Sequence, residues 1–211
     1  MPDLSNKRAL VTGASGGIGR AIAQALHDCG ATVALSGTRR DALDELAAKL
    51  GEKAFAIQAD LGDVTAEDVL VETASSAMGG IDILVNNAGI LRDKTFHKMS
   101  LEDFRLVIDV HLMGSVHCTK AVWNIMREQT YGRVVFTSSS TGLYGNFGQS
   151  NYAAAKMAMV GLMNTLHLEG DKYNIRVNCL APTAGTAMTE GLFPEKAFEL
   201  LSPKTVSPGV V

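Results

Sequence analysis

The 211-residue sequence contains only three cysteines, Cys29, Cys118 and Cys179, and no CxxC pair. An odd number of widely spaced cysteines argues against a disulfide framework and against a zinc finger. We therefore expect a reducing, cytoplasmic setting. The five histidines show no HxxxH spacing, so we expect no metal site.

An excess of charge of one sign is also missing, because 19 basic and 22 acidic residues leave a formal net charge of −3. This weak acidity argues against a nucleic acid or an anionic membrane as the main partner. No apolar run approaches the roughly 18 residues that cross a bilayer, and the N-terminus lacks the layout of a signal peptide. With 46% hydrophobic residues, the chain is expected to fold as a single domain over residues 1–211.

Short apolar runs alternate along the chain with longer amphipathic segments. The expected strands are residues 8–12, 32–36, 54–58, 83–86, 133–137 and 175–179. The longer helical candidates are residues 66–78, 101–127 and 150–173. Near-continuous apolar strands that alternate with helices predict an α/β fold with a doubly wound parallel sheet.

The first strand runs into a glycine-rich turn, TGASGGIG at residues 12–19, and a helical pattern follows at once. Such a turn offers free backbone N–H groups and the positive end of a helix to a pyrophosphate. Gly13 would permit the turn, Gly17 the close approach of a ligand, and Gly19 the packing of the helix on the sheet. The alternative is a glycine-rich turn that binds nothing.

The stretch after the second strand, SGTRR at residues 36–40, bears on the choice of cofactor. An NAD enzyme usually has an acid here that binds the ribose hydroxyls. The first acid is Asp41, which looks like a helix-start residue. Arg39 and Arg40 offer charge to a 2′-phosphate, which favours NADP and leaves NAD possible; alternatively, both arginines form a solvated helical turn. Asp60, after the third strand, is a candidate for the adenine amino group or a plain turn residue.

Tyr152 and Lys156 lie four residues apart on a predicted helix and therefore face the same side. A lysine close to a phenol is expected to lower its pKa from about 10 toward neutrality. Such a tyrosine can protonate a carbonyl oxygen as hydride arrives, or deprotonate an alcohol as hydride leaves. The fifth strand runs straight into a Thr-Ser-Ser-Ser sequence at residues 137–140, which places hydroxyls at a ligand-binding edge of the sheet.

Together these motifs resemble the short-chain dehydrogenase/reductase family. The likeness rests on TGASGGIG, on NNAG at residues 86–89, on Ser139 thirteen residues before Tyr152, and on YAAAK at residues 152–156. It implies a Rossmann sheet with strand order 3-2-1-4-5-6. Family members generally continue for about 40 residues, so we expect no seventh strand and a sixth strand at the sheet edge. Residues 186–211 are expected either to fold over that edge or to leave a marginal, aggregation-prone protein.

The resemblance also implies roles for individual residues. Ser139 would orient the substrate oxygen, Tyr152 would be the acid/base, and Lys156 would bind the nicotinamide ribose. The expected cofactor contacts, besides Tyr152 and Lys156, are Gly13, Ser15, Gly16, Gly17, Ile18, Gly19, Thr38, Arg39, Asp60, Leu61, Asn87, Ala88, Gly89, Val110 and Thr186.

One position departs from the family pattern. The family usually has an asparagine in V-N-L-x-G that links the lysine to a water chain, and here the residue is His111. A histidine can still donate and accept hydrogen bonds, so we count His111 as a candidate catalytic relay. The alternative is a satisfied interior histidine.

Two subfamily resemblances lead to one expected reaction. Residues 1–60 resemble bacterial 3-oxoacyl-[acyl-carrier-protein] reductases, and the later stretches are more similar to the 3-hydroxyacyl-CoA dehydrogenase part of peroxisomal-type multifunctional enzymes. Both act on the 3-position of an acyl thioester. The alternatives are another carbonyl or alcohol substrate, or a non-catalytic nucleotide-binding protein. The family commonly dimerises through the helices expected at residues 101–127 and 150–173, so we expect a homodimer rather than a tetramer.

Overall fold

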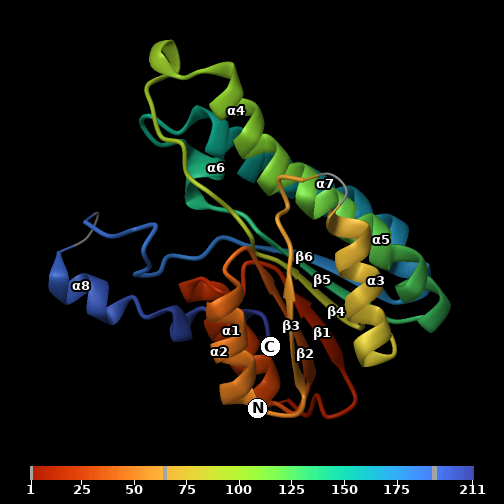
Figure 1. The fold of residues 1–211 in the computed structure, drawn as a ribbon. Helices are drawn as coiled ribbons and strands as arrows, with labels where there is room; N and C mark the ends of the chain where they lie inside the picture. The colour runs from red at the N-terminus through yellow and green to blue at the C-terminus, as the bar shows by residue number, and fades with distance from the viewer. Residues whose placement is uncertain (1, 64–65, 192–193) are drawn as a thin grey trace.

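A six-stranded parallel sheet forms the centre of the computed structural model, which describes residues 2–63, 66–191 and 194–211. The strand order is β3-β2-β1-β4-β5-β6, which confirms the expected doubly wound order (Figure 1). The strands are β1 (Arg8–Val11), β2 (Thr32–Gly37), β3 (Ala54–Gln58), β4 (Ile83–Asn86), β5 (Gly132–Thr137) and β6 (Ile175–Leu180).

Helices cover both faces of the sheet (Figure 1). They are α1 (Gly17–Asp28), α2 (Arg40–Leu50), α3 (Ala66–Met78), α4 (Leu101–Ile108), α5 (Gly114–Gln129), α6 (Ser140–Tyr144), α7 (Ser150–Gly170) and α8 (Glu195–Leu200). Successive residues of a strand point to opposite faces. Accordingly, Val11 packs in one core cluster with Ile22 of α1, and Leu10 packs in a second with Val122 of α5. This burial on both faces explains the near-continuous apolar strands.

Residues 101–129 are helical throughout, as expected for residues 101–127, but the helix is not α-helical along its whole length. A π-helical turn, Asp109–Met113, separates α4 from α5. A π-helical turn inserts extra backbone into the helix, and such turns are frequent at functional sites. Here the turn contains both Val110 and His111, whose side chains are buried.

The C-terminal segment returns across the face of the sheet that carries α1. Val210 and Val211 pack against the α1–α2 core cluster, and Gly209 lies against Leu180 at the end of β6. Within the described residues the sheet ends at β6, so the segment covers a face and adds no seventh strand. The tail thus folds back on the face beside β6, and within the described residues it does not cover the β6 edge as expected. The alternative of a marginal, aggregation-prone protein stays a prediction.

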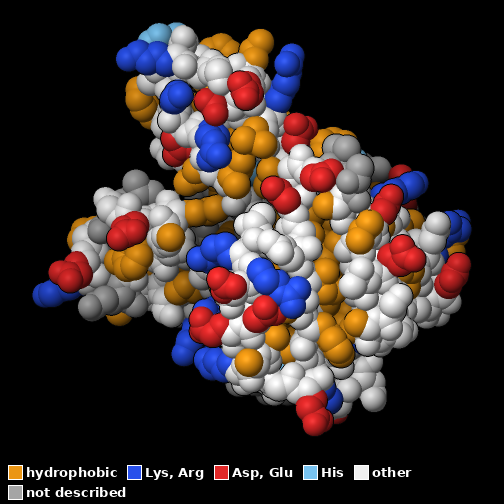
Figure 2. Space-filling model, viewed as in Figure 1, with side chains coloured by type: hydrophobic (Ala, Val, Ile, Leu, Met, Phe, Trp, Pro, Cys, Tyr) orange, Lys and Arg blue, Asp and Glu red, His pale blue; other side chains and the backbone are white. Residues whose placement is uncertain are grey.

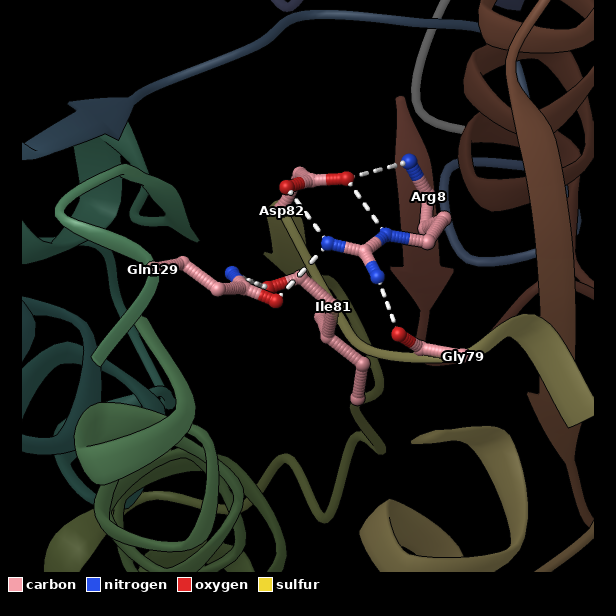
Figure 3. A network of polar contacts seen from close by, with 5 residues as sticks. All are labelled: Arg8, Gly79, Ile81, Asp82 and Gln129. Carbon is pink, nitrogen blue, oxygen red and sulfur yellow. Dashed lines mark hydrogen bonds and ion pairs between the residues drawn. The ribbon is translucent and has the colours of Figure 1, made fainter. Parts of the chain in front are cut away.

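At the amino edge of the sheet, an ion-pair network ties β1 to the turn before β4 (Figure 3). Asp82 accepts hydrogen bonds from the backbone N–H (2.9 Å), Nε (2.7 Å) and Nη2 (3.0 Å) of Arg8. Gln129 accepts from Arg8 Nη2 at 2.7 Å and donates to the Ile81 carbonyl at 2.9 Å. The network therefore sets the alignment of the two strands whose other ends carry the glycine-rich turn and NNAG.

Candidate active site

The glycine-rich turn and the NNAG segment are joined at the carboxyl edge of the sheet. Thr12 Oγ1 accepts hydrogen bonds from the backbone N–H groups of Asn87 (3.0 Å) and Ala88 (3.1 Å). Asn87 Nδ2 in turn donates to the Thr12 carbonyl at 3.0 Å. Gly13 has φ +65°, and a Cβ there would lie 2.8 Å from the Ala88 Cα. Only glycine adopts this positive φ without strain and has no Cβ to clash with the Ala88 backbone, so Gly13 is required for this junction.

The glycine-rich turn leads directly into the N-terminus of α1. Gly16 provides no side-chain cap, so the first N–H groups of the helix are free for a ligand. A Cβ at Gly17 would lie 3.0 Å from Thr186 Cγ2, which places Thr186 over the turn. Ile18 continues the helix, and Gly19 packs directly on the carbonyl of Gly13. The residues present therefore fit a dinucleotide pyrophosphate.

The two arginines that follow β2, Arg39 and Arg40, have different partners. Gly37 lies against Ser15, because a Cβ at Gly37 would come within 2.8 Å of Ser15 Oγ. The exposed Arg39 side chain donates a hydrogen bond to the Ser15 carbonyl. Arg40 instead pairs with Asp44 along α2, with 2.8 Å between Nε and Oδ2. Only Arg39 therefore extends to the glycine-rich turn.

The residues expected around adenine follow β2, β3 and α4. Asp60 is exposed, and its Oδ1 accepts from the Gly62 backbone N–H at 2.9 Å, so it stabilises its own turn. Leu61 and Val110 are buried and Thr38 is exposed beside Arg39. An adenine contact by these residues stays a prediction.

The fold brings Ser139, Tyr152 and Lys156 together. Ser139 follows β5 and begins α6, where its Oγ accepts from the Thr141 N–H at 3.1 Å. Tyr152 lies in the first turn of α7, and Ser139 is close enough to lower the pKa of its phenol. Lys156 follows one turn later, with Nζ 5.5 Å from the Tyr152 ring centroid, and donates to the Thr137 carbonyl at 2.6 Å.

Burial dominates the pKa shifts of Lys156 and Tyr152. It lowers the pKa of Lys156 to about 7. It raises the pKa of Tyr152, and the negative charge of Asp93 raises it further, whereas the hydrogen bond with Ser139 opposes the rise. The expectation of a lowered tyrosine pKa is therefore wrong for this structure. The reason is that burial of the phenol outweighs the effect of Ser139, while the Lys156 ammonium group donates to a backbone carbonyl.

His111 lies between the NNAG segment and Tyr152. Its Nε2 lies 3.0 Å from the Ile90 nitrogen and 2.8 Å from the Ile90 oxygen, and its ring meets that of Tyr152 edge-on, with 5.2 Å between centroids. A side chain at Gly89 would overlap the imidazole. Burial, with a smaller contribution from the charge of Lys156, lowers the pKa of His111 to about 3, so the ring is neutral. Nδ1 is buried, with no hydrogen-bond partner within the described residues.

The sequence motifs did not identify two polar residues beside the site, Asp93 and Gln149. Asp93 follows NNAG by four residues, and Gln149 precedes Tyr152 by three. They hydrogen-bond to each other at 2.7 Å, although 56 residues separate them in the chain. Neither residue carries a periodic or family signal, and only their proximity to Tyr152 reveals them.

Comparisons with known proteins agree with this geometry. A family model described as short chain dehydrogenase matches residues 7–197. A Mycobacterium tuberculosis protein named as a short-chain type dehydrogenase/reductase is 46% identical over 222 residues, which cover all of this chain and 78% of that protein. Mouse peroxisomal multifunctional enzyme type 2 is 46% identical over 211 residues, 96% of this chain but only 29% of the mouse enzyme. A solved structure of a short-chain alcohol dehydrogenase from Sinorhizobium meliloti is 36% identical, with a TM-score of 0.86 over 94% of this chain and 80% of that one.

Proposed function

Because the chain belongs to the short-chain dehydrogenase family, an oxidoreductase family acting on CH–OH and C=O groups, we propose that it interconverts the 3-oxo and 3-hydroxy groups of an acyl thioester. The observation that carries the proposal is the grouping of Ser139 and the buried Lys156 around Tyr152. The nicotinamide cofactor supplies or accepts the hydride when it is bound.

The side chains of this site divide the remaining work. In this proposal the neighbouring hydroxyls of Ser139 and Tyr152 both donate a hydrogen bond to the substrate oxygen. Tyr152 gives its phenol proton to that oxygen during reduction and takes it back during oxidation. Lys156, when protonated, stabilises the phenolate and is available to the ribose of the cofactor. The neutral His111 keeps the NNAG segment and the Tyr152 ring in place, which makes it a positioning residue rather than a proton carrier.

The end of β2 supports NADP as the preferred cofactor. Gly37 leaves the space beside Ser15 free of a carboxylate, and Arg39 is anchored to the Ser15 carbonyl. A 2′-phosphate at this position would meet a guanidinium group that pairs with no carboxylate among the described residues. An acid in the same position would instead favour the ribose hydroxyls of NAD.

The surroundings of the site support a substrate with an apolar chain. Leu143, Tyr144 and Phe147 lie in the segment between Ser139 and Tyr152 and are largely exposed. Figure 2 shows hydrophobic side chains in the notch between the lobe that carries α4 and α6 and the segment that carries α8. The similarity to the mouse multifunctional enzyme agrees with the motifs that resemble 3-hydroxyacyl-CoA dehydrogenases.

The direct test follows NADPH absorbance at 340 nm with acetoacetyl-CoA, with a carrier-protein-linked analogue, and with a simple ketone that lacks the thioester. Tyr152→Phe should abolish turnover and preserve cofactor binding, because the phenol proton is needed only as charge develops on the substrate oxygen. Tyr173→Phe, a surface tyrosine near Arg127, is the matched control. A Tyr152→Phe enzyme within about tenfold of wild type would contradict the assignment. Cofactor binding without substrate-dependent turnover would favour the non-catalytic alternative.

We also propose a homodimer in a reducing, cytoplasmic setting. The exposed Met157 and Leu168 on α7 leave apolar area for a second subunit. The three cysteines form no disulfide. No helix of the described chain has the length and apolarity to span a membrane.

A further inference from the structure

Two loops border the catalytic hydroxyls: residues 87–95 after β4, and residues 138–149, which include α6. Three hydrogen bonds join the first loop to the end of the second and the start of α7. They run from Lys94 N to Gly148 O (2.9 Å), from Asn151 Nδ2 to Arg92 O (3.1 Å), and from Gln149 Nε2 to Asp93 Oδ2 (2.7 Å). Only the last of these joins two side chains, and it can therefore be changed by substitution without altering the backbone.

Gln149 is the centre of this junction. Its side chain is buried although the loop around it is largely exposed. Its Oε1 accepts from Asn146 Nδ2 (2.9 Å) and from Thr141 Oγ1 (3.2 Å). A carboxylate can only accept, so Asp93 requires the amide nitrogen of Gln149 on its side. The amide is thus held in one orientation with three partners.

The same residue connects to both catalytic hydroxyls. Thr141, whose hydroxyl donates to Gln149, also donates its backbone N–H to Ser139 Oγ at 3.1 Å. The Gln149 carbonyl accepts from the Ala153 N–H at 2.8 Å, which begins the helical turn that presents Tyr152. Movement of the Gln149 side chain would therefore be transmitted to Ser139 through α6 and to Tyr152 through α7.

We propose that Gln149 is a positioning residue that holds Ser139 and Tyr152 on one substrate oxygen, and that Asp93 is the anchor that keeps Gln149 in place. The proposal rests on the proposed function, because it concerns the convergence of these two hydroxyls on a substrate. A misplacement of about 1 Å at a reacting group costs up to about 100-fold in rate. The junction therefore has a measurable effect even though neither Gln149 nor Asp93 is given a chemical step.

Asp93 has a second, separable effect on the site. The groups that face Tyr152 are Asp93 from the loop after β4, Ser139 from the end of β5, His111 from the π-helical turn, and Lys156 from its own helix. His111 is neutral and the pKa of Lys156 is about 7, so the charges among them are Asp93 and, below neutral pH, Lys156. Because the carboxylate of Asp93 raises the pKa of Tyr152, Asp93→Asn should move the tyrosine limb of the pH–rate profile to lower pH. A loop residue with a purely structural role would not move this limb.

The test changes which side chain of the Asp93–Gln149 pair can donate the hydrogen bond. Gln149→Glu places two carboxylates against each other while keeping the shape of the side chain, and should lower kcat by about tenfold or more with unchanged NADPH affinity. The double variant Asp93→Asn, Gln149→Glu restores a donor opposite an acceptor and should recover most of kcat. Gln24→Glu is the matched control, because Gln24 Nε2 also donates to a carboxylate, that of Asp28, at 2.7 Å on the surface of α1.

Hydrogen–deuterium exchange of residues 138–149 provides a readout that needs no substrate. Gln149→Glu should accelerate exchange in this loop, and the double variant should restore protection, whereas Gln24→Glu should change neither. Wild-type kcat together with wild-type exchange in Gln149→Glu would overturn the proposal. If wild-type protein fails to turn over any acyl thioester, the proposed substrate is wrong, and the exchange measurement still decides whether Gln149 holds the loop.

Discussion

Asp82→Ala tests the network at the amino edge of the sheet, far from the catalytic hydroxyls (Figure 3). The carboxylate is 7% exposed and the Arg8 side chain 25% exposed, and three hydrogen bonds join the two residues. Removing one partner of a fully buried pair costs about 3–5 kcal/mol because the other charge stays buried without compensation. Since a quarter of Arg8 is in contact with water, we expect a loss of about 2–4 kcal/mol in the free energy of unfolding. For a chain of this length, that corresponds to a fall in Tm of roughly 5–15 °C.

The assay is urea denaturation followed by circular dichroism, with turnover measured well below the transition. Asp44→Ala is the control, because it breaks the exposed Arg40–Asp44 pair and should leave the denaturation midpoint unchanged. Below its transition, Asp82→Ala should keep the cofactor preference of the wild type, because the substitution lies at the opposite edge of the sheet. A midpoint shift no larger than that of Asp44→Ala would refute the reasoning.

Three further predictions concern the cofactor, the buried histidine and the assembly. Arg39→Ala should weaken NADPH binding by about 1.5–3 kcal/mol, as for a lost charge-assisted hydrogen bond, and should leave NADH binding unchanged. Calorimetric titration measures both affinities, and the control Arg40→Ala should change neither. Equal losses for the two cofactors would contradict the contact between Arg39 and the phosphate. The pKa of His111 is about 3 in the folded protein, against an ordinary value of 6.5. Between these two pH values the unfolded chain binds more protons than the folded protein. The free energy of unfolding should therefore fall as the pH drops from 6.5 toward 3. His111→Gln should reduce that fall when denaturation midpoints at pH 4 and pH 7 are compared, and an unchanged difference would show that another group is responsible. Light scattering during size-exclusion chromatography should give a dimer, and a stable tetramer would contradict the expected interface through α5 and α7.

Local patterns determined much of the architecture and of the catalytic group. The apolar strands and the alternating helices predicted the doubly wound parallel sheet, because a strand buried on both faces must be apolar at nearly every position. The strand order followed from the resemblance to the family and is the order observed. The four-residue interval between Tyr152 and Lys156 predicted one helical face, since 3.6 residues complete a turn. The glycine-rich turn was readable for the same reason: Gly13 meets a backbone requirement that only glycine satisfies.

The tertiary structure alone decided what depends on distant neighbours. From the sequence, Arg39 and Arg40 are equivalent candidates for a phosphate contact. In the structure Arg39 contacts Ser15, whereas Arg40 pairs with Asp44. The direction of the Tyr152 pKa shift follows from burial and from Asp93, neither of which a helical interval reveals. The contact between Asp93 and Gln149 also joins residues that are far apart in the chain. Short-range patterns report backbone conformation and helical faces, whereas charge, burial and hydrogen-bond partners are set by segments that meet only when the sheet is assembled.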